Sequence, residues 1–338
     1  MEDIFRKNNN YIRFSEISSH LLCGSKESIP TPQVSIVMPV YNHPDYFKQA
    51  LLSAVNQDYD GEYEIVVVDN NEMSLEPTIN QKIIEEINSP KILYYRNDKN
   101  IGMFGNFNRG IELARADFIT FLHDDDLFLS NALSTLMSIQ KKTGCQGVYS
   151  AYFIIDQNNK KIIDETTTLP EHKRLRLRPF YKYGLWDSFQ GCVVPAGEGA
   201  IFVKQRLLDM GGFNPDFYPS SDYAFLSCYT YYNSVCYQTT PIFEYRKAEN
   251  ESLSAYPKYA ISDKHVLSCI ASKLKVPGFI MRRIVEARMR YQKLHLEVVW
   301  GHKDKSYEDS LSFIDRSIIK LSNFLYQIST IHKRREFK

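Results

Sequence analysis

The feature that most constrains the fold is an alternation of short apolar runs with segments of helical spacing. The runs are rich in β-branched side chains, as expected of buried strands, and they span residues 34–40, 63–70, 91–97 and 117–122. Helical patterns fill the intervals, and a further helix is predicted over residues 128–142, ended by Gly144. This alternation predicts an α/β fold with a doubly wound sheet and right-handed crossovers.

The second half of the chain continues this pattern and then changes in charge. A β-hairpin is predicted over residues 147–165, a helix with Ser221 as its N-cap, and a strand over 241–247. Helical spacing dominates from about residue 258 onward. Residues 261–338 carry 16 Lys and Arg against 8 Asp and Glu, which leaves 25 against 32 for the rest of the chain. A basic helical region therefore follows a mildly acidic body.

Composition excludes several classes of protein. A net charge of +1 and a hydrophobic content of 43% describe a globular chain with no general affinity for nucleic acid. The N-terminus lacks the apolar segment of a secretory signal, and no apolar run approaches the length of a membrane span. The six cysteines show no metal-binding spacing, so free thiols in a reducing cytosol are expected. We expect a cytoplasmic protein.

Three uses remain open for the basic C-terminal region. A solvated helical face is the most common use of such a charge pattern. Peripheral contact with the inner face of a membrane is the second, because basic side chains are attracted to anionic lipid. A homo-oligomer interface is the third.

The stretch "FLHDDDLF" at residues 121–128 places Asp124, Asp125 and Asp126 directly after a predicted strand. Adjacent like charges repel and Asp is a poor strand former, so the run calls for an explanation. One reading is a solvated strand end in which Asp126 caps the next helix. The other is a site for Mg²⁺ or Mn²⁺, because hard divalent ions prefer carboxylate oxygen. The chain has no GxGxxG after its first strand and no GxxxxGK[ST], which removes support for dinucleotide and P-loop readings.

An ordered set of motifs resembles the family 2 glycosyltransferases, which have the GT-A fold. The resemblance covers residues 34–254 and rests on "VSIVMPVYN", "EIVVVDN", "NIGMFGNFNRGIELARADFITFLHDDD", "GEGAIFVKQRLLDMGGFNPDF", "SSDYAF" and "YRKAENESLS". It implies a GT-A-type doubly wound mixed sheet with a C-terminal helical extension. The expected domains are an N-terminal extension (1–30), the GT-A domain (31–257) and the basic helical region (258–338).

The resemblance also implies an activity. Members of this family move a sugar, with inversion, from a nucleotide-diphosphate sugar to an acceptor hydroxyl. For this chain we expect a UDP-sugar donor and a glycan or lipid-linked acceptor in bacterial surface polysaccharide biosynthesis.

Donor-binding residues follow from the resemblance, each with a structural alternative. Pro39, Tyr41 and Asn42 match the stretch that lines the nucleoside pocket, although Tyr41 would also fit as a packing residue under the sheet. Asp69 matches the residue that contacts base or ribose, with local capping as the alternative. A further segment near the donor is matched by residues that could equally serve loop and cap chemistry, namely Asn100, Gly102, Asn106 and Asn108.

The aspartate run matches the metal-binding motif of the family, usually Asp-x-Asp-Asp. Asp125 then falls on the metal ligand, and Asp124 falls at the ribose or beside the metal. His123 stands where the family has its first Asp, and it is open whether it binds the metal, contacts the donor or is a tolerated replacement. A bound metal would neutralise charge that develops on the departing diphosphate.

The expected base is Asp222, which matches the Asp at the start of the helix after the "GGF" segment. It would take the proton from the acceptor hydroxyl, although an Asp at this place also favours a helix N-terminus. The family usually has a carboxylate before it, where this chain has Ser221. Glu198, between Gly197 and Gly199, matches the acceptor-side loop and is expected to bind the acceptor, although a tight turn explains these glycines equally well. Arg246 would reach the diphosphate or form a surface ion pair.

Two other functions remain as alternatives. A sugar-phosphate nucleotidyltransferase would need a Gly-rich loop with Arg after the first strand, which "MPVYNHPD" lacks. A non-catalytic, degenerate glycosyltransferase scaffold that acts as a binding partner is favoured by His123 and Ser221. The presence of Asp125 and Asp222 argues against it.

Overall fold

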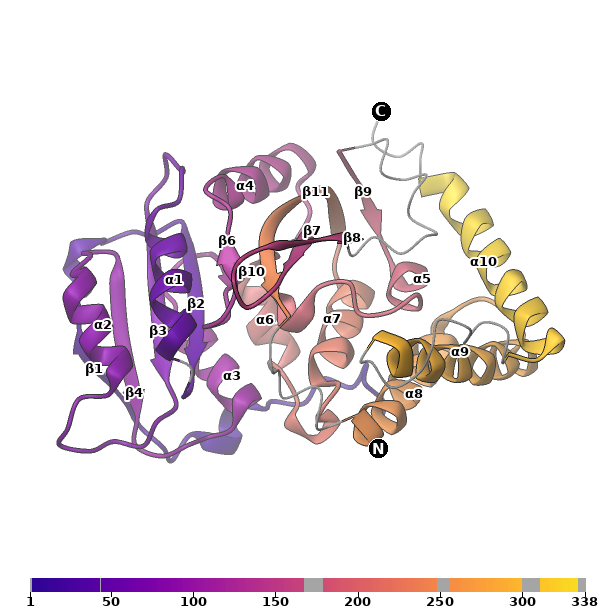
Figure 1. The fold of residues 1–338 in the computed structure, drawn as a ribbon, viewed down its shortest axis with the longest axis horizontal. Coiled ribbons are helices and arrows are strands. Elements are labelled where there is room, and N and C mark those ends of the chain that lie inside the picture. The colour runs from indigo at the N-terminus through magenta and orange to yellow at the C-terminus, as the bar shows by residue number, and fades with distance from the viewer. Residues whose placement is uncertain (1, 43, 167–178, 248–255, 300–310, 334–338) are drawn as a thin grey trace.

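The computed structural model describes residues 2–42, 44–166, 179–247, 256–299 and 311–333, and Figure 1 shows them as a ribbon. An eleven-stranded sheet runs through the molecule in the order β1-β4-β3-β2-β5-β10-β7-β11-β6, with β8 on β7 and β9 on β11. The strands are β1 (Ser19–Cys23), β2 (Val34–Val40), β3 (Tyr63–Asp69), β4 (Ile92–Asn97), β5 (Phe118–Phe121), β6 (Leu127–Phe128), β7 (Gly147–Ile155), β8 (Lys161–Thr166), β9 (Phe180–Tyr183), β10 (Ile201–Val203) and β11 (Val235–Arg246).

Strands β2 to β5 form a parallel part of the sheet, as the sequence predicts, and β1 adds to β4 in the antiparallel direction. Strand β2 pairs in parallel with β3 and β5, and β3 pairs in parallel with β4. The connecting helices are α1 (Pro44–Val55), α2 (Ile79–Ile87) and α3 (Met103–Leu113). The register sets Val40 opposite Asp69, so the carboxyl ends of β2 and β3 lie at the same edge of the sheet. Ligands of such sheets bind at this edge.

Side chains that alternate along the strands build two cores, one on each face of the sheet. Ile36 and Met38 pack with Phe47 of α1 on one face. Val37 packs with Phe107 of α3 on the other. All seven residues of β3 are buried, which explains why its sequence reads as a continuous apolar run.

The C-terminal half of the sheet is mixed. Strand β10 is antiparallel to β5 and β7, whereas β11 is parallel to β7. The helices of this half are α4 (Ala132–Thr143), α5 (Leu185–Ser188), α6 (Lys204–Met210) and α7 (Ser221–Tyr232). A doubly wound mixed sheet is therefore confirmed.

Three helices follow the sheet and lie at one end of the molecule (Figure 1). They are α8 (Tyr256–Lys273), α9 (Gly278–Val299) and α10 (Phe313–Lys333). Arg290 of α9 forms an ion pair with Asp315 of α10 at 2.5 Å, and the Tyr326 hydroxyl donates to Asp187 of α5 at 2.8 Å. The C-terminal helical extension thus packs on the body. Among the described helices, none combines the length and the apolar character needed to cross a membrane.

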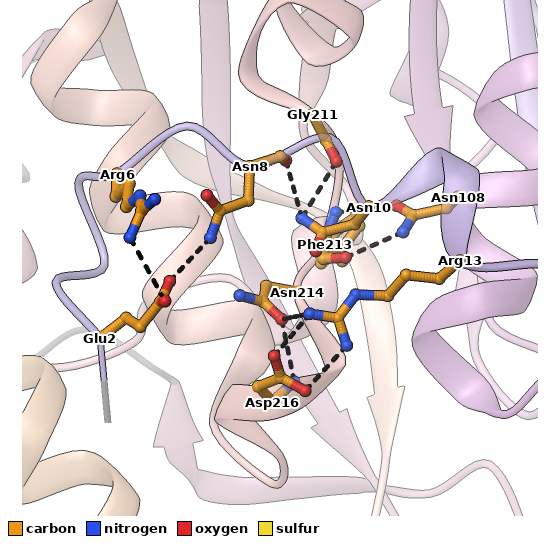
Figure 2. Close-up of polar contacts among 10 residues, drawn as sticks. All are labelled: Glu2, Arg6, Asn8, Asn10, Arg13, Asn108, Gly211, Phe213, Asn214 and Asp216. Carbon is orange, nitrogen blue, oxygen red and sulfur yellow. Dashed lines mark hydrogen bonds and ion pairs between the residues drawn. The ribbon is translucent and has the colours of Figure 1, made fainter.

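The N-terminal residues also pack on the body, as Figure 2 shows. Asn10 donates from its backbone and its side chain to the Gly211 carbonyl, at 2.9 and 3.1 Å. Arg13 donates to Asp216 at 2.8 Å, and Arg109 of α3 donates to the Phe14 carbonyl at 3.0 Å. This segment therefore ties α3 to the loop that precedes α7.

Several local predictions are wrong. The helix predicted from residue 128 begins at Ala132, because residues 127–128 pair with β11 as strand β6. The residue before α7 is Ser220, so Ser221 is the first helical residue rather than the N-cap. Cys145 and Cys236 form a disulfide, so the expectation of free thiols fails for this pair.

Candidate active site

The candidate site begins at the carboxyl end of β5, where the sheet fixes the aspartate run. Phe121 forms an isolated parallel bridge with Glu198, and the Leu122 amide donates to the Val37 carbonyl at 3.1 Å. The next amide, that of His123, donates to the Glu198 side chain at 3.0 Å. The run therefore leaves the sheet at the edge where β2 and β3 also end.

A buried carboxyl pair lies under the aspartate run. Asp126 and Glu198 are 1% and 0% exposed, and each has one oxygen that no described donor reaches, Oδ2 and Oε2 respectively. His123 Nδ1 lies 3.7 Å from both of these oxygens. Burial, with the charge of Glu198, holds the pKa of Asp126 well above its usual range. Burial also raises the pKa of Glu198.

The same turn brings together a set of atoms that could bind a metal. One ligand atom from each of His123, Asp125 and Asp126 lies within 4.8 Å of the others. Asp125 and His123 are partly exposed, whereas Asp126 is buried. Two carboxylates with one imidazole suit a divalent ion, and carboxylate oxygen in particular suits Mg²⁺ or Mn²⁺. His123 Nε2 is buried and reaches no described partner, which agrees with a ligand role for this ring.

Arg246, the last residue of β11, donates hydrogen bonds to the aspartate run. Its Nε donates to the Asp125 carbonyl at 2.7 Å, and its backbone amide donates to Asp126 Oδ1 at 2.5 Å. Its guanidinium stacks over Tyr46 with 4.2 Å to the ring centre. The residue is 0% exposed, so the predicted surface ion pair is wrong. Arg246 fixes the backbone of the candidate metal ligand.

Asp222 lies at the start of α7, where the helix packs on the 3₁₀ turn Pro195–Gly197. Its Oδ2 accepts from the Ala196 amide at 3.1 Å, and its Oδ1 accepts from the Tyr223 amide at 2.7 Å. Burial raises the pKa of Asp222, and these amides together with His123 lower it in part. Ala196 stands two residues before Glu198, whose side chain accepts from the His123 amide, so this turn links Asp222 to the aspartate run.

Ser221, which replaces the usual carboxylate, has a buried Oγ with no hydrogen-bond partner among the described residues.

The predicted nucleoside stretch reaches the aspartate run through its backbone. The Tyr41 amide donates to Asp124 Oδ2 at 3.1 Å, which ties the end of β2 to the run after β5. Tyr41 is 45% exposed, so it is available to a ligand and is not a packing residue under the sheet. Asn42 has a φ of 56°, a conformation that Asn tolerates better than most residues, and Pro39 is partly exposed.

Asp69 has a complete set of protein partners. Its Oδ1 accepts from the amide and side chain of Asn71, at 2.9 and 2.8 Å. Its Oδ2 accepts from Thr78, Asn80 and Tyr94, at 3.0, 3.3 and 2.8 Å. The side chain is 0% exposed. Its contact with base or ribose stays a prediction.

The asparagines after β4 are also paired within the protein. Asn100 Oδ1 accepts from Asn70 at 2.9 Å and from the Gly102 amide at 2.8 Å. Asn106 donates to the Val68 carbonyl at 2.8 Å. Asn108 bonds both backbone groups of Phe213, with distances of 2.8 and 2.7 Å. The loop and cap role is thus observed, and the donor contacts stay predictions.

The interaction that sequence reasoning missed is the one between Glu198 and His123. Glu198 was expected at the acceptor, yet its buried carboxyl contacts the His123 amide. Gly197 and Gly199 flank it with φ of 82° and 59°, so the turn itself requires glycines. A buried Glu between two such glycines was the only available signal. Acceptor binding by Glu198 stays a prediction.

Comparisons with known proteins agree with this fold and site. Residues 35–197 match the family model described as Glycosyl transferase family 2. The GalNAc(5)-diNAcBac-PP-undecaprenol beta-1,3-glucosyltransferase of Campylobacter jejuni is 27% identical over 66% of this chain and 68% of its own length. The putative colanic acid biosynthesis glycosyl transferase WcaA of Escherichia coli is 35% identical over 32% of this chain and 37% of its own.

Solved structures extend the likeness in fold. S. aureus TarS 1-349 in complex with UDP-GlcNAc superposes with a TM-score of 0.58, covers 90% of both chains and is 14% identical. At that identity the likeness concerns the fold alone, which is the GT-A fold. Residues 35–197 thus form a family 2 glycosyltransferase domain, and the relatives support a glycosyltransferase enzyme.

Proposed function

We propose that the protein is an inverting glycosyltransferase that moves a sugar from a UDP-sugar to a hydroxyl of a glycan or lipid-linked acceptor in bacterial surface polysaccharide assembly. The observation that carries the proposal is the approach of two groups at one edge of the sheet. Ligand atoms of His123, Asp125 and Asp126 lie within 4.8 Å of one another, and Asp222 accepts from the Ala196 amide in the turn that leads to Glu198, the partner of the His123 amide. A leaving-group site and a base are the two elements that direct displacement requires.

The choice of donor and acceptor rests on the similar proteins. TarS is described in complex with UDP and with UDP-GlcNAc, which supports a UDP-sugar donor for this chain. The Campylobacter jejuni relative is named for a glycan on undecaprenol diphosphate, which supports a lipid-linked acceptor. The Escherichia coli relative is named for colanic acid, a second argument for surface polysaccharide. The proposed catalytic domain is residues 31–257, between the extension 1–30 and the basic region 258–338.

We propose that Asp125 holds Mg²⁺ or Mn²⁺, with His123 and Asp126 beside it. The bound ion would supply charge neutralisation for the departing nucleoside diphosphate. Arg246 keeps the Asp125 backbone in place through its 2.7 Å hydrogen bond. Asp124 receives the Tyr41 amide and so keeps the predicted nucleoside stretch, residues 39–42, next to this site.

Asp222 is the proposed general base. Its carboxylate accepts the proton of the acceptor hydroxyl as that oxygen attacks the sugar from the face opposite the diphosphate, which inverts the anomeric configuration. Burial raises the pKa of Asp222 from the usual value of a carboxyl, and this makes the carboxylate a stronger base. The Ala196 amide holds one of its oxygens, so the orientation of the base is set by the backbone.

The test is a transfer assay with the full chain. UDP release is measured with a panel of UDP-sugars, Mn²⁺ and an undecaprenyl-diphosphate-linked acceptor, and the anomeric configuration of the product is read by NMR. We expect inverted product from the wild type and turnover lowered by about 10²- to 10⁴-fold in Asp222→Asn, which keeps the shape of the side chain. Retained configuration would refute the mechanism. A folded wild type that binds no nucleotide and turns over no donor would favour the non-catalytic scaffold.

A further inference from the structure

The last helix, α10, is apolar on two adjoining faces. Its inner side faces the body of the protein: Ser322 and Tyr326 are buried, and Ile318 and Leu325 pack against the main core. Its outer side carries a second set of large apolar residues at spacings of seven, three and four, which keep them on one helical face. This outer stripe consists of Ile314, Leu321, Phe324 and Ile328, with Phe313 in the first turn.

The outer stripe is exposed in the structure. Phe313 is 82% exposed, Phe324 is 57% exposed, and the other members are between 42% and 64% exposed. Exposed apolar residues scattered singly are normal, but a continuous stripe on one helix face is characteristic of a surface that binds something. The stripe lies at the end of the molecule away from β1 to β4 (Figure 1), and it contains no residue of the candidate active site.

The charge on α10 indicates what the stripe would bind. Arg316 and Lys320 are exposed and adjoin the stripe, whereas the only acidic residue of the helix, Asp315, is buried and paired with Arg290. A second copy of the chain would bring the same positive charge against this face. An anionic surface complements it. Basic residues next to a stripe of Phe, Leu and Ile are the pattern of helices that lie in a membrane interface.

We propose that the outer stripe of α10 docks the protein on the surface of an anionic lipid bilayer. The apolar side chains enter the boundary between headgroups and acyl chains, and Arg316 and Lys320 extend toward the headgroup phosphates. The inner side of α10 stays packed on the body through Tyr326 and Asp315, so the helix lies flat on the membrane and carries the enzyme with it. This inference does not depend on the proposed donor, metal or base.

Binding to vesicles tests the proposal. The full-length protein is sedimented with vesicles of phosphatidylcholine alone and with vesicles that also contain phosphatidylglycerol. We expect binding to the anionic vesicles and at least about tenfold weaker binding for the double variant Leu321→Ser/Phe324→Ser. The matched control is Leu75→Ser/Ile79→Ser, which removes two exposed apolar residues from the opposite half and should bind like the wild type. Lys320→Glu should weaken binding to the anionic vesicles specifically.

Insertion of the stripe can be followed separately. In Phe324→Trp, the added fluorescence should be quenched by brominated lipid, whereas in Ile79→Trp it should not.

The proposal is overturned if the wild type stays unbound with both kinds of vesicle, or if the stripe variant binds as well as the wild type. If the wild type does not bind vesicles, and light scattering shows that it is a dimer while the stripe variant is a monomer, the face belongs to an interface with a second copy of the chain. Transfer to a soluble acceptor should be unchanged in the stripe variant, so failure here is distinct from failure of the proposed activity.

Discussion

Two polar clusters lie at the carboxyl ends of β3 and β5, the strands on either side of β2, and they differ in how many of their buried polar atoms have hydrogen-bond partners in the protein. At the end of β3, both oxygens of Asp69 accept protein hydrogen bonds, and the asparagines nearby are paired with backbone and with each other. At the end of β5, His123 Nε2, Asp126 Oδ2 and Glu198 Oε2 are buried and reach no described partner. Buried polar groups are normally hydrogen-bonded, so the second cluster is the exception.

The difference separates structural from chemical roles. A carboxylate whose two oxygens are both hydrogen-bonded, as those of Asp69 are, holds the strand ends in place and gains nothing from a ligand. A cluster with open atoms costs stability until a cation or proton fills it. Substitutions in the cluster at the end of β3 should therefore lower the free energy of unfolding and leave turnover unchanged. Substitutions in the cluster at the end of β5 should lower turnover and leave the free energy of unfolding nearly unchanged. The predictions below follow this contrast, from the largest expected effect on turnover to the smallest.

The largest effect is expected for Asp222→Asn. Loss of a general base lowers turnover by about 10²- to 10⁴-fold, and the Asn oxygen can still accept from the Ala196 amide. Nucleotide binding, measured by calorimetry, should stay within about twofold of the wild type, since Asp222 is proposed to act on the acceptor. Near-normal turnover in this variant would remove Asp222 from the mechanism.

Asp125→Ala should lower turnover by about 10²-fold, because the charge on the departing diphosphate would lack its counter-ion. The variant should unfold at the temperature of the wild type within error, since the Asp125 side chain is partly exposed and its backbone carbonyl still accepts from Arg246. Differential scanning calorimetry measures the unfolding temperature, and a transfer assay over a range of Mn²⁺ concentrations measures the loss of turnover. A destabilised variant with normal metal dependence would make Asp125 a structural residue.

The pH dependence of turnover should follow the ionisation of Asp222. Burial raises its pKa, and the base works only when deprotonated, so kcat/KM should rise with pH through this raised pKa. Below that pKa the rate should fall about tenfold per pH unit. Nucleotide binding measured over the same pH range is the control. A parallel loss of binding would assign the acid limb to the donor site instead.

The smallest effect on turnover is expected for Asn108→Ala. The substitution leaves the amide and carbonyl of Phe213 without their partners, which should lower the free energy of unfolding by about 2–4 kcal/mol. Activity per folded molecule should be close to that of the wild type at low temperature. The matched control Asn158→Ala, at an exposed hairpin turn, should change stability by less than about 0.5 kcal/mol. Normal stability with lost nucleotide binding would move Asn108 into the donor site.

The sequence predicted what depends on local pattern. Strand β2 has the predicted bounds of 34–40, β3 ends one residue earlier than predicted, and the alternation of strands and helices predicted the parallel pairing found among β2 to β5. Pairings between distant segments were not predictable in the same way. Strand β1 adds to β4 at the edge of the sheet, and residues 127–128 join β11 instead of starting a helix. Neither pairing has a local signal.

The same limit applies to the site. The sequence predicted that the polar residues gather at the carboxyl ends of the strands, and the contact between Tyr41 and Asp124 agrees with this because β2 and β5 are neighbours in the sheet. The contact of Glu198 with His123 joins residues 75 positions apart, and only the bridge between Phe121 and Glu198 brings them together. The burial of Arg246 could not be predicted from the sequence either, because an Arg near a strand end usually lies on the surface.

Calorimetric titration with UDP, GDP, dTDP and CMP, each with and without Mn²⁺, tests the central claim most directly. The account predicts that UDP binds only when Mn²⁺ is present, and that Asp125→Ala abolishes this binding while Asn108→Ala retains it. Binding of no nucleotide under either condition, by folded wild-type protein, would contradict the account and leave the aspartates as the end of a strand on a non-catalytic scaffold.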